Sequence, residues 1–219
     1  MAVDVKKTEK EYYQARTTPA LVEVPEMLFL MQDGTGDPNT SGEYIQAVQA
    51  LYGLAYAIRM KKDWPGYFEF VVPPLEGLWD FDDPAFRGRG QPIPDKSRFR
   101  WTMMIRQPDF VTTEVFEEAR ALLAAKKPEL DLAGVRLEPF HEGLCVQVMH
   151  IGPYDDEPLT VAKLDRFTEE AGYEPDFGGM RRHHEIYLSD PRKTQPVRLK
   201  TLLRHPVRRR KSPGEGSGS

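Results

Sequence analysis

The chain contains an internal repeat, and this repeat constrains its fold more than any other feature of the sequence. The segment LFLMQDGTGDP in the first half resembles LCVQVMHIGPYDDEP in the second, and setting Gly36 on Gly152 gives a shift of 116 residues. The same shift places Glu69 of GYFEFVV on Glu185 of RHHEIYL. A further pair, MIRQP and LLRHP, matches with a shift of 98 residues. Such a repeat predicts one structural unit that occurs twice.

Each half is expected to form a strand, a helix and two further strands. Apolar residues at helical spacing, such as Tyr44 and Val48, predict the helices, and short apolar or alternating runs predict the strands. Thr40 and Glu43 form a capping-box pattern before the first helix. The stretch 73–97, rich in Pro, Gly and Asp, is expected to be a loop. We predict strands at 23–32, 66–72 and 98–106 with a helix at 41–62, and strands at 143–151, 183–189 and 198–204 with a helix at 158–171.

The expected fold class is therefore α+β, with two duplicated β-α-β-β units and a linker helix at about 112–127 that Thr112 can cap. Two fused copies usually meet about a pseudo-twofold axis, which would place a ligand cleft between the halves. The predicted organisation is an N-terminal extension at 1–20, one domain at 21–207 and a flexible tail at 208–219. Within the domain, repeat 1 covers about 21–107 and repeat 2 about 135–207.

Composition and charge indicate a protein of the cytoplasm that binds neither membranes nor nucleic acid directly. The net charge is −4, and no segment resembles a signal peptide or a membrane span. Cys145 is the one cysteine, so no intrachain disulfide can form, and its apolar surroundings indicate a buried thiol. The basic run 208–211 leads into a Ser/Gly-rich end, which is typical of a solvated tail. The segment before Val22 is too short for a helix-turn-helix domain.

The stretch HHEIYLSDPRK, residues 183–193, raises the question of a metal or catalytic site. Adjacent side chains on a strand point to opposite faces, so His183 and His184 cannot easily share one ion, and we expect no metal. Ser189 lacks the Gly-x-Ser-x-Gly context of a nucleophile elbow. The GTG at 34–36 lacks the further glycine or lysine of a phosphate-binding loop.

A carboxylate among aromatic residues is the remaining signal. Strand alternation places Glu185 and Tyr187 on one face, which we expect to lie away from the helices, while Ile186 and Leu188 face the core. Such a group suits a flat, apolar or cationic ligand. In the alternative interpretation, Glu185 is a surface residue paired with an arginine and the aromatic residues are ordinary core. Further aromatic or apolar candidates near this face are Tyr67, Trp79, Trp101, Met103 and Tyr154.

Four segments together resemble the GyrI-like small-molecule-binding proteins. They are GYFEFVVPPLEGLWD, MIRQPDFVT, EGLCVQVMHIGPYDDEP, and HHEIYLSDPRK followed by LKTLLRHPV. The resemblance covers about residues 10–207 and is strongest to a stand-alone bacterial subgroup without a DNA-binding domain. It implies the duplicated β-α-β-β fold with a ligand cleft between the copies. Some members of this subgroup resemble cyclopropanoid cyclopropyl hydrolases, which open the strained ring of DNA-alkylating natural products and so detoxify them.

The resemblance also implies roles for individual residues. Glu185 would position or deprotonate the attacking water, and Tyr154 and Tyr187 would donate hydrogen bonds. No cofactor is implied, and the partner would be a planar aromatic or cationic small molecule bound by a monomer or a homodimer. A non-catalytic ligand sensor, or a regulator that binds another protein, is the alternative. The expected ligand contacts are Trp101, Trp79, Tyr67, Glu69, His183 and Met103, and in an alternative interpretation Glu69 is only a solvent-facing residue left from the duplication.

Overall fold

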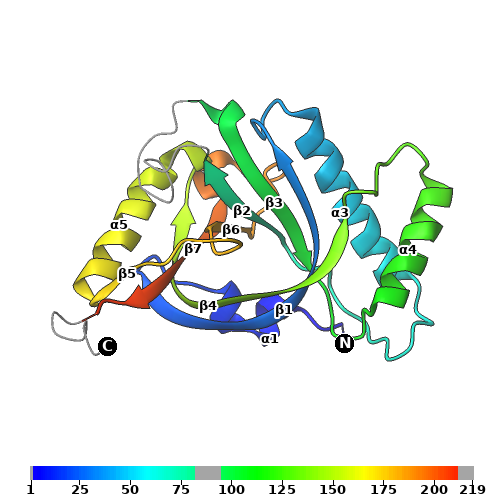
Figure 1. The fold of residues 1–219 in the computed structure, drawn as a ribbon, viewed down its shortest axis with the longest axis horizontal. Helices are drawn as coiled ribbons and strands as arrows, with labels where there is room; N and C mark the ends of the chain where they lie inside the picture. Colours follow the sequence, from blue (N-terminus) through cyan, green and yellow to red (C-terminus); the bar gives the residue numbers. More distant parts are fainter. Residues whose placement is uncertain (1, 82–94, 212–219) are drawn as a thin grey trace, which may run out of the picture.

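The computed structural model describes residues 2–81 and 95–211 and has a mixed α/β fold around one antiparallel sheet (Figure 1). In the described ranges the strands follow the spatial order β4-β1-β3-β2-β6-β7-β5, and β4 also pairs with β7, so that six of them close into a barrel-like ring. The α+β fold class is confirmed. The strands are β1 (Ala20–Thr35), β2 (Leu75–Phe81), β3 (Phe99–Arg106), β4 (Arg136–Ile151), β5 (Tyr173–Pro175), β6 (His183–Tyr187) and β7 (Lys200–Arg209).

Both halves contain a strand, a helix and two further strands in that order, and the second half has the additional short strand β5 before β6. β1 and β4 have 16 residues each, and each is followed by a glycine at positive φ, Gly36 at 99° and Gly152 at 145°. The Gly36 N–H donates to the carbonyl of Phe99 at 2.9 Å, and the Gly152 N–H donates to that of Leu199 at 3.1 Å. Across the halves, β1 pairs with β4 and β2 pairs with β6. This symmetric pairing agrees with a duplication, and the pseudo-twofold relation itself stays a prediction.

The strand predicted at 66–72 is wrong. In that segment Phe70 forms an isolated bridge with Val3, and Phe68 and Phe70 pack their rings against Phe110. The second strand of the first half is β2, which lies inside the stretch predicted as a loop. Its residues are almost all buried between β3 and β6, whereas 66–72 lies between Pro65 and Pro73, whose rings remove backbone donors. Glu69 lies outside β2, the strand of the first half that pairs with β6, so Glu69 is not the structural counterpart of Glu185.

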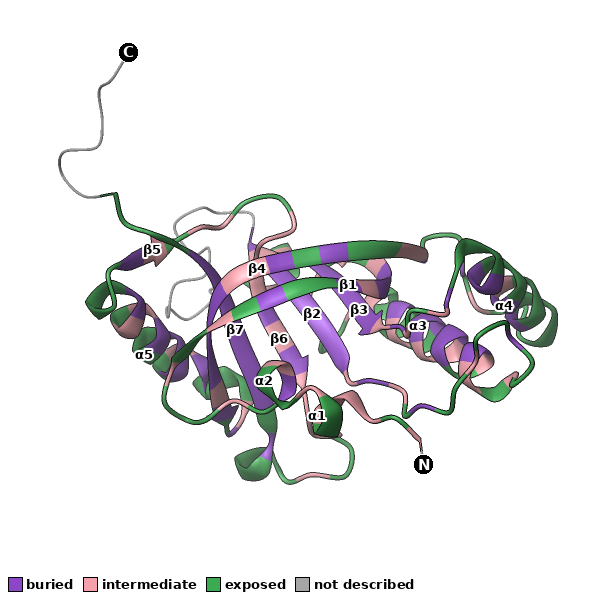
Figure 2. Cartoon of the chain, turned by 90° about the horizontal axis from the view of Figure 1, so that it is seen from below, coloured by how far each residue is buried: buried purple, intermediate pink, exposed green. Residues whose placement is uncertain are grey.

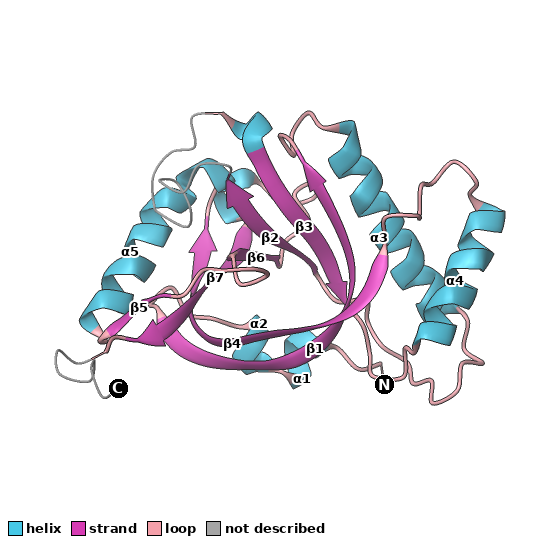
Figure 3. Cartoon of the chain, viewed as in Figure 1, coloured by secondary structure: helices cyan, strands magenta, loops and turns pink. Residues whose placement is uncertain are grey.

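Helices flank the sheet on two sides (Figure 3). Helix α3 (Gly42–Met60) packs its buried alanine and leucine residues on the strands of the first half, and α4 (Thr113–Lys126) packs against α3. Helix α5 (Glu157–Glu170) packs on β4 and β7. Ser41, not Thr40, caps α3, because its hydroxyl accepts from the Tyr44 N–H at 3.3 Å. Thr112 caps α4 as predicted, through the Val115 N–H at 3.4 Å. No helix in these described ranges is both long and apolar enough to cross a membrane.

The N-terminal segment lies under the opposite face of the sheet (Figure 2). It forms two short helices, α1 (Val5–Thr8) and α2 (Lys10–Tyr13), and Tyr13 is buried against Ile186 and Leu202. At the other end of the chain, β7 extends through Arg208 and Arg209, so the predicted tail is wrong for these two residues. Residues 212–219 of that tail lie outside the described residues.

Candidate ligand-binding site

A cleft of about 2400 Å³ opens on the face of the sheet on which α3 and α5 pack. Residues from β2 and β6 line it, together with residues of α3 and the start of α5. Glu185 therefore faces the helices, and the prediction that it points away from them is wrong. The reason is that the other face of β6, with His184 and Ile186, is buried beneath the N-terminal segment. Five of the predicted site residues line the cleft, namely Trp79, Tyr154, His183, Glu185 and Tyr187.

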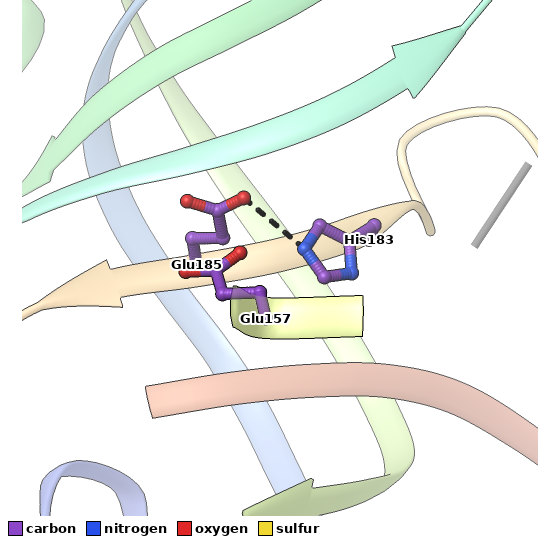
Figure 4. A group of neighbouring side chains, drawn as sticks. All are labelled: Glu157, His183 and Glu185. Carbon is purple, nitrogen blue, oxygen red and sulfur yellow. Dashed lines mark hydrogen bonds and ion pairs between the residues drawn. The ribbon is translucent and has the colours of Figure 1, made fainter. Parts of the chain in front are cut away.

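Two hydrogen bonds hold the Glu185 side chain in the cleft, and a third holds one of its partners. The Tyr187 hydroxyl donates to Glu185 Oε2 at 2.8 Å, and Trp79 Nε1 donates to the Tyr187 hydroxyl oxygen at 2.9 Å. His183 Nε2 lies 3.1 Å from Glu185 Oε1 (Figure 4). Burial, and then the charge of Glu185, raise the pKa of Tyr187 well above its usual value. Tyr187 therefore stays a hydrogen-bond donor, and the bonded carboxylate keeps a fixed orientation.

A second carboxyl group, that of Glu157, lies against Glu185 (Figure 4). Glu157 begins α5 and is 8% exposed, and its Oε1 has no hydrogen-bond partner among the described residues. Burial, and then the neighbouring Glu185, raise the pKa of Glu157 well above its usual value. Two adjacent carboxyl groups in a desolvated site cannot both ionise easily. Glu157 is therefore the member of the pair on which a proton is favoured.

Aromatic rings form the walls above this pair. Tyr44 of α3 stacks on Trp79 with ring centroids 6.2 Å apart and planes 29° apart, and Phe99 contacts Trp79 edge-on at 5.2 Å. Tyr154 meets Tyr187 edge-on at 6.0 Å. Burial, and then Glu185, raise the pKa of Tyr154 to about 12, so its hydroxyl stays protonated. The resulting surface is aromatic, with a single acidic centre at its base.

Four predicted contacts are not among the residues that line the cleft. Trp101 and Met103 are 1% and 0% exposed, because β2 separates their strand β3 from β6 and α3 covers them. The Tyr67 hydroxyl donates to the carbonyl of Arg59 at 3.0 Å. Glu69 is exposed and pairs with Lys62 at 2.8 Å. The positions of these four side chains do not support the predicted contacts with a ligand.

Sequence reasoning missed Glu157 and Tyr44 as site residues. Glu157 follows two aspartates at the start of a helix, where an acidic residue is ordinary, and Tyr44 was counted with the apolar core of α3. The order of strand and helix within the repeat could have pointed to both, since each lies in the first turn of the helix that follows the first strand of its half.

The two adjacent histidines point to opposite faces of β6, as predicted. His184 lies between the carboxylates of Glu76 and Glu142, 3.0 Å from each, on the buried side. On the cleft side, Glu157, His183 and Glu185 have one potential ligand atom each within 4.8 Å of one another. Carboxylate oxygen and imidazole nitrogen are donors that divalent ions accept. In the described structure Tyr187 and His183 already hydrogen-bond to Glu185, and the expectation of a metal-free site stays a prediction.

One comparison with known proteins identifies a family, and another finds similar solved structures. A family model described as a GyrI-like small molecule binding domain matches residues 17–208. The structure of an uncharacterized conserved protein from Listeria innocua is 48% identical with a TM-score of 0.88, and the match covers 94% of this chain and 100% of that chain. A structure described as a hydrolase from Listeria innocua is 47% identical with a TM-score of 0.85, over 94% of this chain and 100% of that chain.

A more distant similarity concerns the fold alone. The C-terminal domain of EcmrR is 15% identical with a TM-score of 0.52, and the match covers 88% of this chain and 98% of that domain. A search of curated proteins found no match.

Proposed function

The chain belongs to the GyrI-like small-molecule-binding domain family, and from this premise we propose that its cleft binds planar hydrophobic or cationic molecules and hydrolyses cyclopropanoid ones. The observation that carries the proposal is the pair of carboxyl groups, Glu157 and Glu185, at the base of an aromatic cleft. A Listeria innocua structure 47% identical to this chain is described as a hydrolase, which supports a hydrolytic reaction. Detoxification of an alkylating compound would follow from that reaction.

Binding is explained by the rings and the charge of the cleft. Tyr44, Trp79 and Phe99 offer faces and edges on which a flat ring system can pack. The carboxyl pair attracts a cationic group, and aromatic faces also favour cations, by about 0.5–2 kcal/mol each. A planar cation is therefore stabilised by both the aromatic rings and the carboxyl pair, and a neutral planar ligand is stabilised by the rings alone.

Hydrolysis of a cyclopropanoid adds the oxygen of water to the cyclopropyl CH₂ carbon and breaks one carbon–carbon bond of the ring. The electron pair of that bond moves into the dienone, whose carbonyl oxygen becomes a phenolate and then takes up a proton. One proton leaves the attacking water. Water alone balances this reaction, so we expect it to require neither a cofactor nor a metal. Because ring strain is released, correct orientation of water and substrate can supply much of the rate.

Each side chain of the site then has a role that its position supports. Glu185 carries the negative charge and accepts the proton of the attacking water. Glu157, whose pKa is raised by burial and by Glu185, favours its protonated form and so limits the charge of the pair. The Tyr154 hydroxyl, protonated because its pKa is raised to about 12, can donate to the dienone oxygen. Tyr187 and His183 keep the Glu185 carboxylate in place through their hydrogen bonds.

The experiment follows loss of the cyclopropane ring by mass spectrometry in a cyclopropanoid alkylator incubated with the protein. We expect conversion to the water adduct by the wild-type protein, and a loss of roughly 100-fold or more in rate for Glu185→Gln. Glu69→Gln, which changes an exposed acid outside the cleft, is the matched control. Equal rates for wild type and Glu185→Gln would refute the role of Glu185, and an unchanged rate with EDTA is expected.

A parallel titration separates binding from chemistry. Quenching of tryptophan fluorescence by a rhodamine dye should be saturable, because Trp79 lines the cleft. If the dye binds but no cyclopropanoid is converted, the protein is a ligand sensor and not a hydrolase. If the dye does not bind either, the cleft is not the ligand site.

A further inference from the structure

Behind the cleft, a line of polar side chains leads from Glu185 toward the surface of α5. His183 Nε2 lies 3.1 Å from Glu185 Oε1, and its other ring nitrogen, Nδ1, lies 2.7 Å from Nε2 of His205 on β7. The remaining nitrogen of His205, Nδ1, is 3.7 Å from Oδ1 of Asp165 on α5. These residues come from three separate elements and form one continuous series of titratable groups.

Burial distinguishes this series from surface polar contacts. His205 is 1% exposed, with the ring of Phe177 packed edge-on against it at 5.1 Å. The side chain of Asp165 is 35% exposed, so the outer end of the series reaches solvent. Burying two imidazoles in contact is costly unless their hydrogen bonds are satisfied. Here each His183 ring nitrogen has a partner, and the inner end of the series is a cleft carboxylate.

We propose that His183, His205 and Asp165 form a proton path that connects Glu185 with solvent behind the ligand cleft. The inference rests on the proposed function, in which Glu185 takes a proton from the attacking water. A planar ligand that fills the cleft would separate Glu185 from bulk water on the open side. Among its described neighbours, Tyr187 donates its hydroxyl proton to Glu185 and Glu157 favours its protonated form, whereas His183 contacts both Glu185 and His205, so His183 is the contact that can pass a proton on.

The proton balance along the path is simple. The step starts with a proton on each ring nitrogen of His183, with Nε2–H directed at Glu185 Oε1 and Nδ1–H directed at His205 Nε2. When Glu185 takes a proton from water, the Glu185–His183 contact holds one proton more than before. His183 then releases its Nδ1 proton to His205 Nε2, while His205 releases its Nδ1 proton to Asp165 or to water beside it. Burial, and then the neighbouring His183, lower the pKa of His205, although Asp165 opposes this shift. A lowered pKa disfavours the retention of an extra proton on His205. The charged or titratable groups near His205 are Asp165, His183 and Glu142, and those near His183 are Glu157 and Glu185.

The decisive variants are His205→Gln and Asp165→Asn. A glutamine can keep a single hydrogen bond to His183, but an amide cannot accept one proton and release another. We expect kcat for cyclopropanoid hydrolysis to fall on the order of tenfold in His205→Gln, with KM and the dissociation constant of a rhodamine dye unchanged. Asp165→Asn should lower kcat in the same direction and shift its pH profile. Glu169→Gln, which changes an exposed acid on α5, is the control and should behave as wild type.

Each outcome decides the proposal. Wild-type kcat and an unchanged pH profile in both His205→Gln and Asp165→Asn would overturn it. If His205→Gln does not fold, Asp165→Asn alone carries the test, because its side chain is partly exposed. If the wild-type protein converts no cyclopropanoid, the proposed function fails, and ¹⁵N NMR of the histidine rings decides whether the path exists. A His183 titration that shifts in Asp165→Asn then supports the path, and an unchanged titration refutes it.

Discussion

Tyr187 connects the sheet to the site through one hydroxyl group. That hydroxyl accepts a hydrogen bond from Trp79 Nε1 and donates one to Glu185 Oε2. A single oxygen therefore fixes the positions of both the Trp79 ring and the Glu185 carboxylate. Removing it leaves a largely buried indole N–H without its partner. The cost of such an unsatisfied group exceeds the modest net value of the hydrogen bond itself.

We therefore expect Tyr187→Phe to lower the free energy of unfolding by about 1–3 kcal/mol. Dye affinity should also fall, because both Trp79 and Glu185 lose a positioning contact. Tyr67→Phe removes a hydroxyl that bonds to a backbone carbonyl outside the cleft and serves as the control for binding. Urea denaturation and fluorescence titration measure the two effects, and unchanged affinity in Tyr187→Phe would contradict the assigned role.

Glu157 makes stability depend on pH in a defined direction. Its folded pKa is raised above the unfolded value, so its contribution to stability is complete below the unfolded pKa and is lost as pH rises toward the folded pKa. Glu157→Gln cannot ionise and should be more stable than wild type at pH 8, with little difference at pH 4. Thermal unfolding at both values checks this, and a stabilisation that is equal at both pH values would contradict a raised pKa.

At the scale of elements, β2 depends on a glycine that faces the site. A Cβ atom at Gly77 would lie 2.8 Å from Trp79 Nε1 and 3.2 Å from the Tyr187 hydroxyl oxygen. These rings fold over the glycine, directly beside its register partner Glu185. The absence of a side chain at Gly77 is therefore what lets two neighbouring strands bring an indole and a phenol together.

Gly77→Ala should therefore disrupt the site while the rest of the sheet stays folded. We expect a loss of about 1–3 kcal/mol in unfolding free energy, typical of overpacking, and weaker dye binding. Gly42→Ala is the matched control, because nothing lies within 4 Å of its added Cβ and it stands in the first turn of α3. Alanine favours a helix over glycine by up to about 1 kcal/mol, so Gly42→Ala should be neutral or stabilising. Full dye affinity in Gly77→Ala would contradict the packing argument.

At the scale of the whole molecule, a buried ionic network holds the two halves and the N-terminal segment together. His184 of the second half bonds to Glu76 of the first half and to Glu142, and Arg204 bonds to Glu142 at 2.7 Å. Arg204 also donates to the carbonyl of Tyr12 at 2.7 Å. Burial opposes charge on His184, but Glu142 and Glu76 outweigh it and raise its pKa to about 9. The network is electrically balanced while His184 is protonated.

Stability should therefore decrease in mildly alkaline solution. Because the folded pKa of His184 is raised, its contribution is complete below the unfolded pKa and is lost as pH rises through about 9. In a Glu157→Gln background, which removes another group whose folded pKa is raised, the melting temperature should still fall between pH 7 and pH 9. His184→Gln should be destabilised by about 3–5 kcal/mol at pH 7, since it leaves buried carboxylates without their cation. A flat stability profile in Glu157→Gln would contradict the raised pKa of His184.

The sequence by itself determined the features that depend on local pattern. Helical spacing and capping residues predicted α4 and α5 within a residue or two, and the repeat predicted that β1 and β4 are equivalent. Strand alternation separated His183 from His184 and placed Glu185 with Tyr187. Each of these follows from neighbours within a few residues or from a direct comparison of two segments. The three site residues on β6, namely His183, Glu185 and Tyr187, could therefore be predicted from the sequence alone.

Only the tertiary structure decided which elements lie beside β6. The sequence did not reveal that β2 lies between β3 and β6, so Trp101 and Met103 were assigned to a cleft from which they are excluded. Nor did it reveal that α5 brings Glu157 against Glu185, or that β7 brings His205 against His183. Strand order and helix placement are set by contacts between residues far apart in the chain. The periodicity of apolar residues along the chain does not predict which of these distant residues come into contact.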